Sequence, residues 1–383
     1  MTRTLELLDR LIAFPTVSRD PNRALIDFVA AFLAERGIES ELVATPDGRK
    51  ANLFATIGPK DVPGVMLSGH TDVVPVDGQN WSSDPFRMAV RDGRAYGRGT
   101  ADMKGFVAAA LALAERAASE PLATPLHIAL SHDEEIGCVG VRSLIDVMAI
   151  RPLKPRFCLV GEPTSMRVAL GHKGKLAARA CAHGMAGHSA LAPKALNAIH
   201  LACDFVERLR ARQAELAANG RMDADYDVPY TTIHVGTIAG GTALNIVPDT
   251  CTLDFEIRNI AGEDATGILG LLRQDADAIV ARERPRFECA AIDIETVNAY
   301  PALDTPPDAE VVAFAKALVG DDAHFKVAFG TEGGLFHEIL SIPTVVCGPG
   351  SMEQGHKPDE FVALDQLAAA DAMMERLLGA LRG

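Results

Sequence analysis

The chain has 383 residues, of which 48% are hydrophobic, and a formal net charge of −14, with 37 Lys and Arg against 51 Asp and Glu. A chain of this length exceeds what one hydrophobic core usually serves, so we expect two domains. The acidic balance argues against nucleic acid or an anionic membrane as the main partner, because binding phosphate groups requires a basic face.

Helical and strand patterns alternate through the first part of the chain. Apolar periodicity predicts amphipathic helices in TLELLDRLIAF and in ALIDFVAAFLAERG, the second closed by Gly37. Short buried strands that run into polar turns are predicted in GVMLSGHTD, PLHIALSHDEE and PRFCLVGEP, and a packed helix in FVAAALALAERAA. Such alternation predicts an α/β fold with a mainly parallel sheet, which binds ligands beyond the carboxyl ends of its strands.

The pattern changes near residue 174. A strand and turn, a long amphipathic helix, two strands around a Gly-rich turn and another helix follow in the order β-α-β-β-α. We therefore expect an inserted α+β domain over 174–286, within a domain formed by residues 1–173 and 287–383.

Location is predicted from the cysteines and the apolar runs. The seven cysteines are odd in number and show no C-x-x-C spacing, which favours reduced thiols in a cytoplasmic protein. The N-terminal MTRTLELLDRLIAF has acidic residues among apolar ones at helical spacing, unlike a signal peptide. The longest apolar run, VAAALALA, is too short to cross a bilayer. We expect a cytoplasmic protein without membrane association.

Five candidate metal ligands follow short apolar runs or begin a helix. Two imidazoles and three carboxylates, one of them shared, are what two divalent ions need if each keeps a position open for water. Acidic residues of a solvated surface would not repeatedly fall at the ends of buried strands. The five are His70 in SGHTDVVP, Asp102 in GRGTADMKG, Glu135 in SHDEEIG, Glu162 in LVGEPT and His356 in GSMEQGHKPDE.

Two of these motifs have simpler explanations. His70 and Asp72 lie two residues apart, which in extended backbone places both side chains on one face, so Asp72 can orient the His70 ring. A loop histidine beside an aspartate is the alternative. Asp102 begins a predicted helix, so it can equally be an N-cap that accepts a backbone N–H.

The adjacent carboxylates Glu134 and Glu135 at the end of an apolar strand point to opposite sides. Burying both without a cation is costly. One can bind a metal while the other takes a proton from a water shared by the metals, a task that suits a pKa raised by burial. A solvated acidic loop is the alternative.

In combination, GHTDVVP, GRGTADMKG, SHDEEIG, GEPT and GHKPDE, with HGMAGHSA and LNIVPDTCTLDFEIR between them, resemble the M20 family of dinuclear zinc peptidases and deacylases. The match covers essentially the whole chain in order. Within that family, GTEGGLF and IPTVVCGPGSMEQGHKPDEFV are most similar to acetylornithine deacetylases.

The resemblance implies a role for each residue. His70 and Glu162 would bind one ion, Glu135 and His356 the other, and Asp102 both. Glu134 would be general base and acid, and Asp72 would orient His70. Zinc is the default ion, with cobalt or manganese as alternatives.

The resemblance also implies that residues 1–173 and 287–383 form the catalytic metal-binding domain and that the insert over 174–286 is a lid or dimerisation domain. It further implies substrate contacts. His188, in HGMAGHSA of the inserted domain, would stabilise the oxyanion, often from the partner subunit of a homodimer. Asn245 and Arg258 would contact the substrate carboxylate, and Glu332 would help to recognise a substrate amine. From the residues alone, His188 and Asn245 are equally turn residues and Arg258 a surface strand residue.

The implied substrate is a small N-acyl amino acid. We expect hydrolysis of N2-acetyl-L-ornithine to acetate and L-ornithine, a step of arginine biosynthesis. A succinyl-diaminopimelate desuccinylase and a broad N-acyl-amino-acid amidohydrolase or carboxypeptidase share the same metal site. A non-catalytic metal-binding protein is disfavoured because Glu134, the residue whose loss most simply ends activity, is present.

Overall fold

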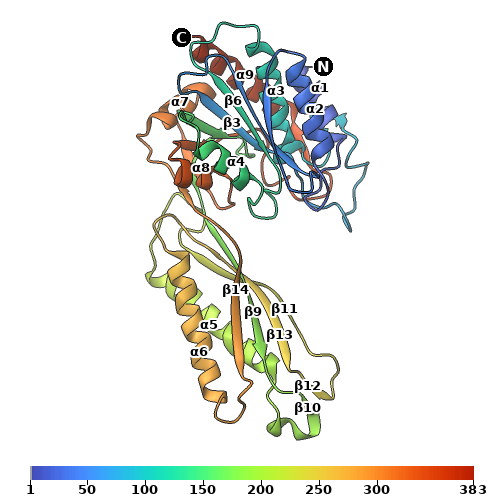
Figure 1. Ribbon diagram of the computed structural model, residues 1–383, viewed down its shortest axis with the longest axis vertical. Coiled ribbons are helices and arrows are strands. Elements are labelled where there is room, and N and C mark those ends of the chain that lie inside the picture. Colours follow the sequence, from blue (N-terminus) through green and yellow to red (C-terminus); the bar gives the residue numbers. More distant parts are fainter. Residues whose placement is uncertain (1) are drawn as a thin grey trace. The chain divides into compact units, whose positions relative to one another are not determined.

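The computed structural model describes residues 2–383 and divides the chain into two compact units (Figure 1). The first unit runs to His172 and resumes over Leu303–Val327 and Thr331–Gly383. The second unit is Lys173–Ala302 together with Ala328–Gly330. None of the helices formed by residues 2–383 is both long and apolar enough to cross a membrane.

The first unit is built on a nine-stranded sheet. Its central strands run parallel in the order β6 (Leu126–Ser131), β3 (Val65–His70), β7 (Phe157–Val160) and β17 (Thr344–Val346). Because the strands are parallel, the residues that follow β3, β6 and β7 meet at one edge of the sheet. The flanking strands are β1 (Ser40–Ala44), β2 (Ala51–Ile57), β8 (Val168–His172), β15 (Leu303–Asp304) and β16 (His324–Val327).

Helices complete this unit. α3 (Gly105–Ala117) is an alanine-rich helix whose small side chains are nearly all buried, and it packs against α1 (Arg3–Ile12) and α9 (Leu364–Arg382). A π-helical turn, η1 (Thr100–Lys104), leads into α3. The other helices are α2 (Arg23–Ala34), α4 (Val141–Ala149), α7 (Glu310–Val319) and α8 (Gly333–Leu340), and a small separate sheet contains β4 (Ala89–Arg91), β5 (Arg94–Tyr96) and β18 (Phe361–Ala363).

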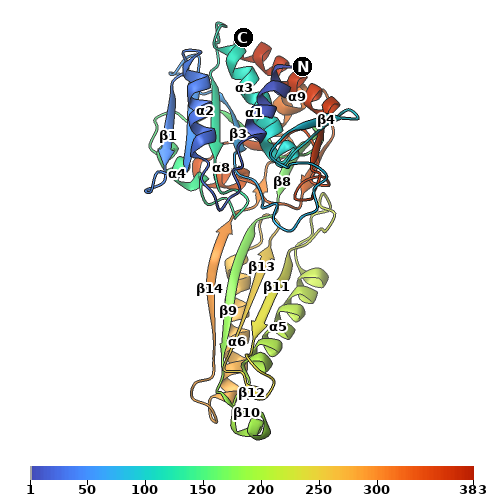
Figure 2. The same cartoon turned by 90° about the vertical axis from the view of Figure 1, so that its right-hand side faces the viewer.

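The second unit is an antiparallel sheet with two helices on one face (Figure 2). Its strand order is β11 (Thr232–Gly240), β13 (Thr250–Arg258), β9 (Lys175–His183) and β14 (Ala291–Tyr300). Every second residue of β13 is buried against α5 (Ala198–Asn219) and α6 (Ala265–Glu283), the alternation expected of a strand with one covered face. The short strands β10 (Gly187–His188) and β12 (Ile246–Val247) pair at one end of this sheet, and η2 (Ser189–Lys194) follows β10.

The expected fold class is confirmed: a mainly parallel α/β unit carries an inserted α+β unit. The expected end of the insert at residue 286 falls short of the structure, in which the second unit extends to Ala302. The reason is β14, which pairs with β9 over its whole length and so belongs to the inserted sheet. Its sequence, AIDIETVNAY, alternates only weakly, and the sequence patterns predict no element there.

Candidate metal centre

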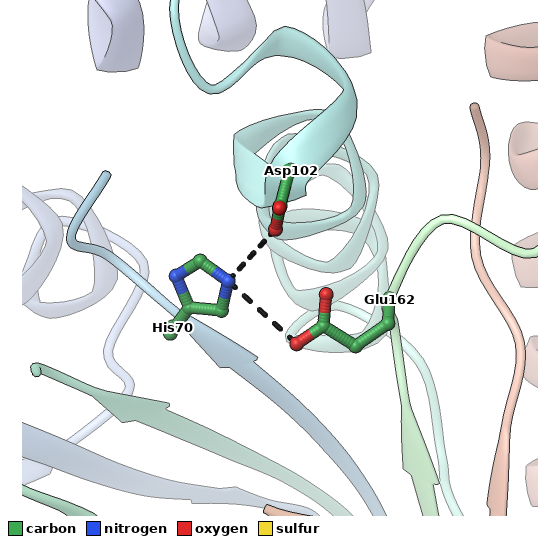
Figure 3. Close-up of side chains that lie close together, drawn as sticks. All are labelled: His70, Asp102 and Glu162. Atoms are coloured by element: carbon green, nitrogen blue, oxygen red, sulfur yellow. Dashed lines mark hydrogen bonds and ion pairs between the residues drawn. The ribbon is translucent and has the colours of Figure 1, made fainter. Parts of the chain in front are cut away.

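Three of the predicted ligands meet at the carboxyl edge of the large sheet (Figure 3). His70 is the last residue of β3, Glu162 lies two residues beyond β7, and Asp102 comes from η1 at the start of α3. Nε2 of His70 lies 3.0 Å from Oδ1 of Asp102 and 3.6 Å from Oε1 of Glu162. All three side chains are buried, with 1% to 4% of their surface exposed.

The remaining two predicted ligands form a second group with the same aspartate. Nε2 of His356 lies 3.1 Å from Oδ2 of Asp102 and 3.0 Å from Oε2 of Glu135. Asp102 therefore turns one carboxylate oxygen to each histidine. This is the arrangement by which one carboxylate bridges two cations.

The donor set fits divalent transition ions. Each group offers one imidazole nitrogen and two carboxylate oxygens, and the ligand atoms of a group lie within 4.8 Å of one another. Nitrogen and oxygen ligands of this kind suit zinc, and also cobalt or manganese. The residues present therefore fit two ions that share Asp102.

The charges of the cluster shift its pKa values strongly. Hydrogen bonds to Asp102 and Glu135 raise the pKa of His356 to about 10. Burial opposes a charge on His70, but Glu162 and Asp102 outweigh it and raise the pKa of its imidazole well above the ordinary value. Burial and the neighbouring Asp102 raise the pKa of Glu135 to about 7 and that of Glu162 well above its usual range. Metal ions at these groups would therefore compete with protons.

Asp72 organises the loop that follows β6. Its Oδ1 accepts the backbone N–H of Glu134 at 3.1 Å, and its Oδ2 accepts that of Glu135 at 3.3 Å. The hydroxyl of Ser18, a residue the sequence reasoning missed, donates to the same Oδ2 at 2.7 Å. Nδ1 of His70 contacts the backbone carbonyl of Asp72 at 2.9 Å, whereas the Asp72 carboxylate is 3.6 Å away. The carboxylate is engaged by the loop, so Asp72 contacts His70 mainly through its main chain.

Glu134 lies in this loop next to the ligand Glu135. Burial raises the pKa of Glu134 well above its ordinary value, and the charges of Glu135 and Glu332 add to this effect against the opposing influence of His70. The thiol of Cys138, also missed from the sequence, donates to Oε1 of Glu134 at 3.3 Å. A carboxyl group with a raised pKa beside candidate metal ligands is a candidate for proton transfer.

Glu332 immediately precedes α8 in the same unit and is 1% exposed. Its Oε2 accepts a weak hydrogen bond from the hydroxyl of Ser68 at 3.4 Å, while Oε1 has no hydrogen-bond partner among residues 2–383. Burial raises the pKa of Glu332 to about 7. A buried carboxyl oxygen without a partner retains the capacity to accept a donor from a bound molecule.

The inserted unit brings His188 and Asn245 together. His188 pairs with Ile246 across β10 and β12, and the N–H of Ser189 donates to the carbonyl of Asn245 at 3.0 Å. The His188 side chain is exposed, and its Nδ1 accepts the N–H of Ala190 at 3.1 Å. The local fold therefore presents His188 on the surface of one end of the inserted sheet.

Arg258 lies at the opposite end of that sheet. It is the last residue of β13, whereas Asn245 precedes the first residue, Thr250. Eight strand residues at about 3.3 Å each separate Thr250 from Arg258 by roughly 26 Å. Arg258 donates to Oε1 of Glu256 at 2.9 Å and to the hydroxyl of Tyr300 at 3.0 Å. One chain therefore cannot present both His188 and Arg258 to the same small molecule.

Comparison with known proteins decides the family. A model of peptidase family M20/M25/M40 matches residues 66–380. The chain belongs to the M20 peptidase family. This M20 hydrolase is 34% identical to the acetylornithine deacetylase of Proteus mirabilis (strain HI4320) over 381 residues, which covers 98% of this chain and 95% of the relative. It is 34% identical to that of Pasteurella multocida (strain Pm70), over 98% of this chain and 97% of the relative.

Solved structures of the M20 family have the same fold. The metallo-carboxypeptidase Sso-CP2 from Sulfolobus solfataricus superposes with a TM-score of 0.80 at 19% identity, over 99% of each chain. The Bacillus subtilis YXEP protein, described as a dinuclear metal-binding peptidase of the M20 family, gives a TM-score of 0.69 at 16% identity, over 99% of this chain and 98% of that one.

Proposed function

We propose that this M20 hydrolase cleaves the amide bond of a small N-acyl amino acid, with N2-acetyl-L-ornithine as the substrate and acetate and L-ornithine as the products. The observation that carries the hydrolytic part is the position of Asp102 between two imidazole–carboxylate groups, with Glu134 in the adjoining loop. The substrate part is supported by 34% identity to acetylornithine deacetylases over nearly the whole chain. The reaction would then belong to arginine biosynthesis.

Two divalent ions, zinc by default, would be held by the two groups that share Asp102. His70 and Glu162 would complete one position, and Glu135 and His356 the other. When bound, such ions lower the pKa of water and polarise a carbonyl oxygen.

Glu134 would act as general base and then as general acid. Its carboxylate takes a proton from the attacking water and later delivers it to the nitrogen of the departing amine. The C–N bond breaks and the oxygen of water enters the carboxylate product. The second proton of that water is released when the new carboxyl group ionises, and it gives the amine its positive charge. The raised pKa of Glu134 supports this role because a more basic carboxylate accepts the proton of water more readily.

His188 and Asn245 would act from a second copy of the chain. Because they lie at the opposite end of β13 from Arg258, a site that uses all three residues requires two subunits. We therefore infer a homodimer formed through the inserted unit. His188 would stabilise the oxyanion, and Asn245 and Arg258 would bind the substrate carboxylate. A guanidinium suits that task, because it binds carboxylates through paired hydrogen bonds.

Glu332 would recognise the substrate's side-chain amine. This role is supported by its buried carboxyl group, one oxygen of which lacks a protein partner among the described residues. An ammonium group, directly or through a water molecule, would compensate a negative charge at this position.

A substrate panel tests the proposal. Amine release is measured with N2-acetyl-L-ornithine, N-succinyl-diaminopimelate and N-acetyl-methionine, using zinc-loaded protein and a chelated control. The proposal predicts preference for acetylornithine, loss of turnover on chelation, and recovery with zinc or cobalt. Metal-dependent turnover of another substrate would overturn the substrate assignment, and turnover that survives complete metal removal would overturn the mechanism.

A further inference from the structure

A buried carboxylate outside the predicted ligand set fixes the main chain at Asp102. Glu360, at 1% exposure, accepts the backbone N–H groups of Ala101 and Asp102 at its Oε1, at 2.9 and 3.1 Å. Asp102 is therefore held at two points. Its carboxylate contacts the two histidines, and its backbone N–H donates to Glu360. Glu360 follows His356 by four residues, so one short segment supplies a candidate ligand and the anchor of another.

Arg98 connects Glu360 to a separate loop. Its guanidinium is 1% exposed, and Nη1 donates to Oε2 of Glu360 at 2.6 Å. Nη2 donates to Oε1 of Gln79 at 2.7 Å. A buried ion pair adds little net stability compared with apolar residues. The contribution of Arg98 is instead geometric, because its planar guanidinium bonds Glu360 and Gln79 at the same time.

Gln79 completes the connection to His356. Its Nε2 donates to the backbone carbonyl of His356 at 3.0 Å. Its Oε1 accepts from both Arg98 and the indole Nε1 of Trp81, at 2.7 and 3.0 Å, which fixes which way the amide faces. His356 has φ +62°, in the left-handed region that residues other than glycine seldom adopt, so an added hydrogen bond to its carbonyl helps to hold this conformation.

We propose that Gln79, Arg98 and Glu360 are positioning residues that join the main chains of Asp102 and His356 and preorganise the metal position completed by Glu135. The inference rests on the proposed two-ion hydrolase. The position completed by His70 and Glu162 shares only Asp102 with this chain of hydrogen bonds. Loss of Gln79 therefore weakens the Glu135–His356 position selectively.

Zinc titration of the metal-free full-length protein tests the proposal. The variant Gln79→Ala removes the bond to His356 from a partly exposed position, so its effect on folding is small. We expect one ion to bind as in the wild type and the other about 10–100-fold more weakly, as for other residues that support metal ligands. Arg98→Lys, which keeps a charge for Glu360 but lacks the planar fork, loosens Gln79 and also Glu360, the anchor of Asp102, so it should weaken both ions.

The matched control is Ser82→Ala. Ser82 lies in the same loop and bonds to Asp359 without contacting either ligand, so the control should bind both ions normally. Trp81 is the only tryptophan of the chain, so its emission reports on Gln79 directly. In the wild type, the second equivalent of zinc should change the emission of Trp81. In Gln79→Ala, the same change should require a higher zinc concentration.

Four results overturn the inference. Equal zinc affinities in Gln79→Ala and the wild type, or equal weakening of both ions, would exclude selective support of His356. The same weakening in Ser82→Ala would attribute the effect to the loop in general. A wild type that binds fewer than two ions would overturn the proposed function and this inference together, whereas a two-ion wild type with an unaffected variant overturns the inference alone.

Discussion

The backbone N–H of Glu134 donates a 3.1 Å hydrogen bond to the carboxylate of Asp72. The same carboxylate accepts the N–H of Glu135, so one buried side chain fixes the proposed base and a candidate ligand together. Both residues lie in the loop beyond β6, so this relationship fixes the main chain that carries the two carboxylates.

Replacing Asp72 by Ala should impair both metal binding by Glu135 and proton transfer by Glu134. Two backbone N–H groups lose their acceptor, so we expect zinc affinity and turnover to fall by about 10–100-fold each. Zinc titration and steady-state kinetics measure the effect. Asp77→Asn, at an exposed ion pair with Arg19, serves as the control and should leave both unchanged. Unaltered zinc binding in Asp72→Ala would contradict the assigned role.

Glu134→Gln separates chemistry from metal binding. The amide keeps the shape of the side chain but cannot accept the proton of water, so turnover should fall by a factor on the order of 10² to 10⁴. Zinc content, measured by elemental analysis, should stay at the wild-type value. Glu135→Gln should instead lower the zinc content. Wild-type turnover in Glu134→Gln would refute its role as base.

The proposed dimer predicts complementation between two inactive variants. His188→Ala removes a residue supplied to the other subunit, whereas Glu134→Gln removes a residue used by its own subunit. A mixed dimer contains one intact site, with Glu134 from the His188→Ala chain and His188 from the Glu134→Gln chain. Mixing the two variants and allowing subunit exchange should therefore restore activity that neither variant has alone. A mixture as inactive as its components would contradict a shared site.

The pKa shifts predict that the metal-free protein loses stability as pH rises. The folded-state pKa of His356 is raised to about 10, so its contribution is complete below its unfolded value near 6.5 and is lost between about 6.5 and 10. Glu135, raised to about 7 mainly by burial, holds its proton in the folded state, so stability also falls between about 4.5 and 7.

Thermal melts of chelated protein at several pH values measure this dependence. The difference in Tm between the wild type and His356→Gln should shrink as pH rises from about 6.5 to 10. Zinc, which replaces the protons, should raise Tm most at the upper end of this range. A difference that grows with pH would contradict the assigned contacts of His356.

The proximity of the candidate ligands could be predicted from the sequence because it follows from local patterns. His70 and Glu162 follow apolar strands whose parallel pairing brings their ends together, and the structure places them with Asp102. The role of Asp72 was predicted less well. The expected carboxylate contact to His70 is replaced mainly by a carbonyl contact, because the loop amides at Glu134 and Glu135 compete for that carboxylate.

Features that depend on long-range pairing were not predictable from patterns. The strand β14 is assigned to the inserted unit only by its register with β9. The separation of His188 from Arg258 depends on the length and direction of β13. Arg98 and Glu360 stand inside quoted motifs, yet nothing in the sequence indicates that they pair across 262 positions.

Anomalous scattering from crystals of the zinc-loaded protein would show whether Asp102 bridges two metal ions. We expect two zinc peaks, each about 2.0–2.2 Å from a different carboxylate oxygen of Asp102. One peak should lie beside His70 and Glu162, and the other beside Glu135 and His356. A single peak, or two peaks of which one does not contact Asp102, would show that Asp102 does not bridge two ions.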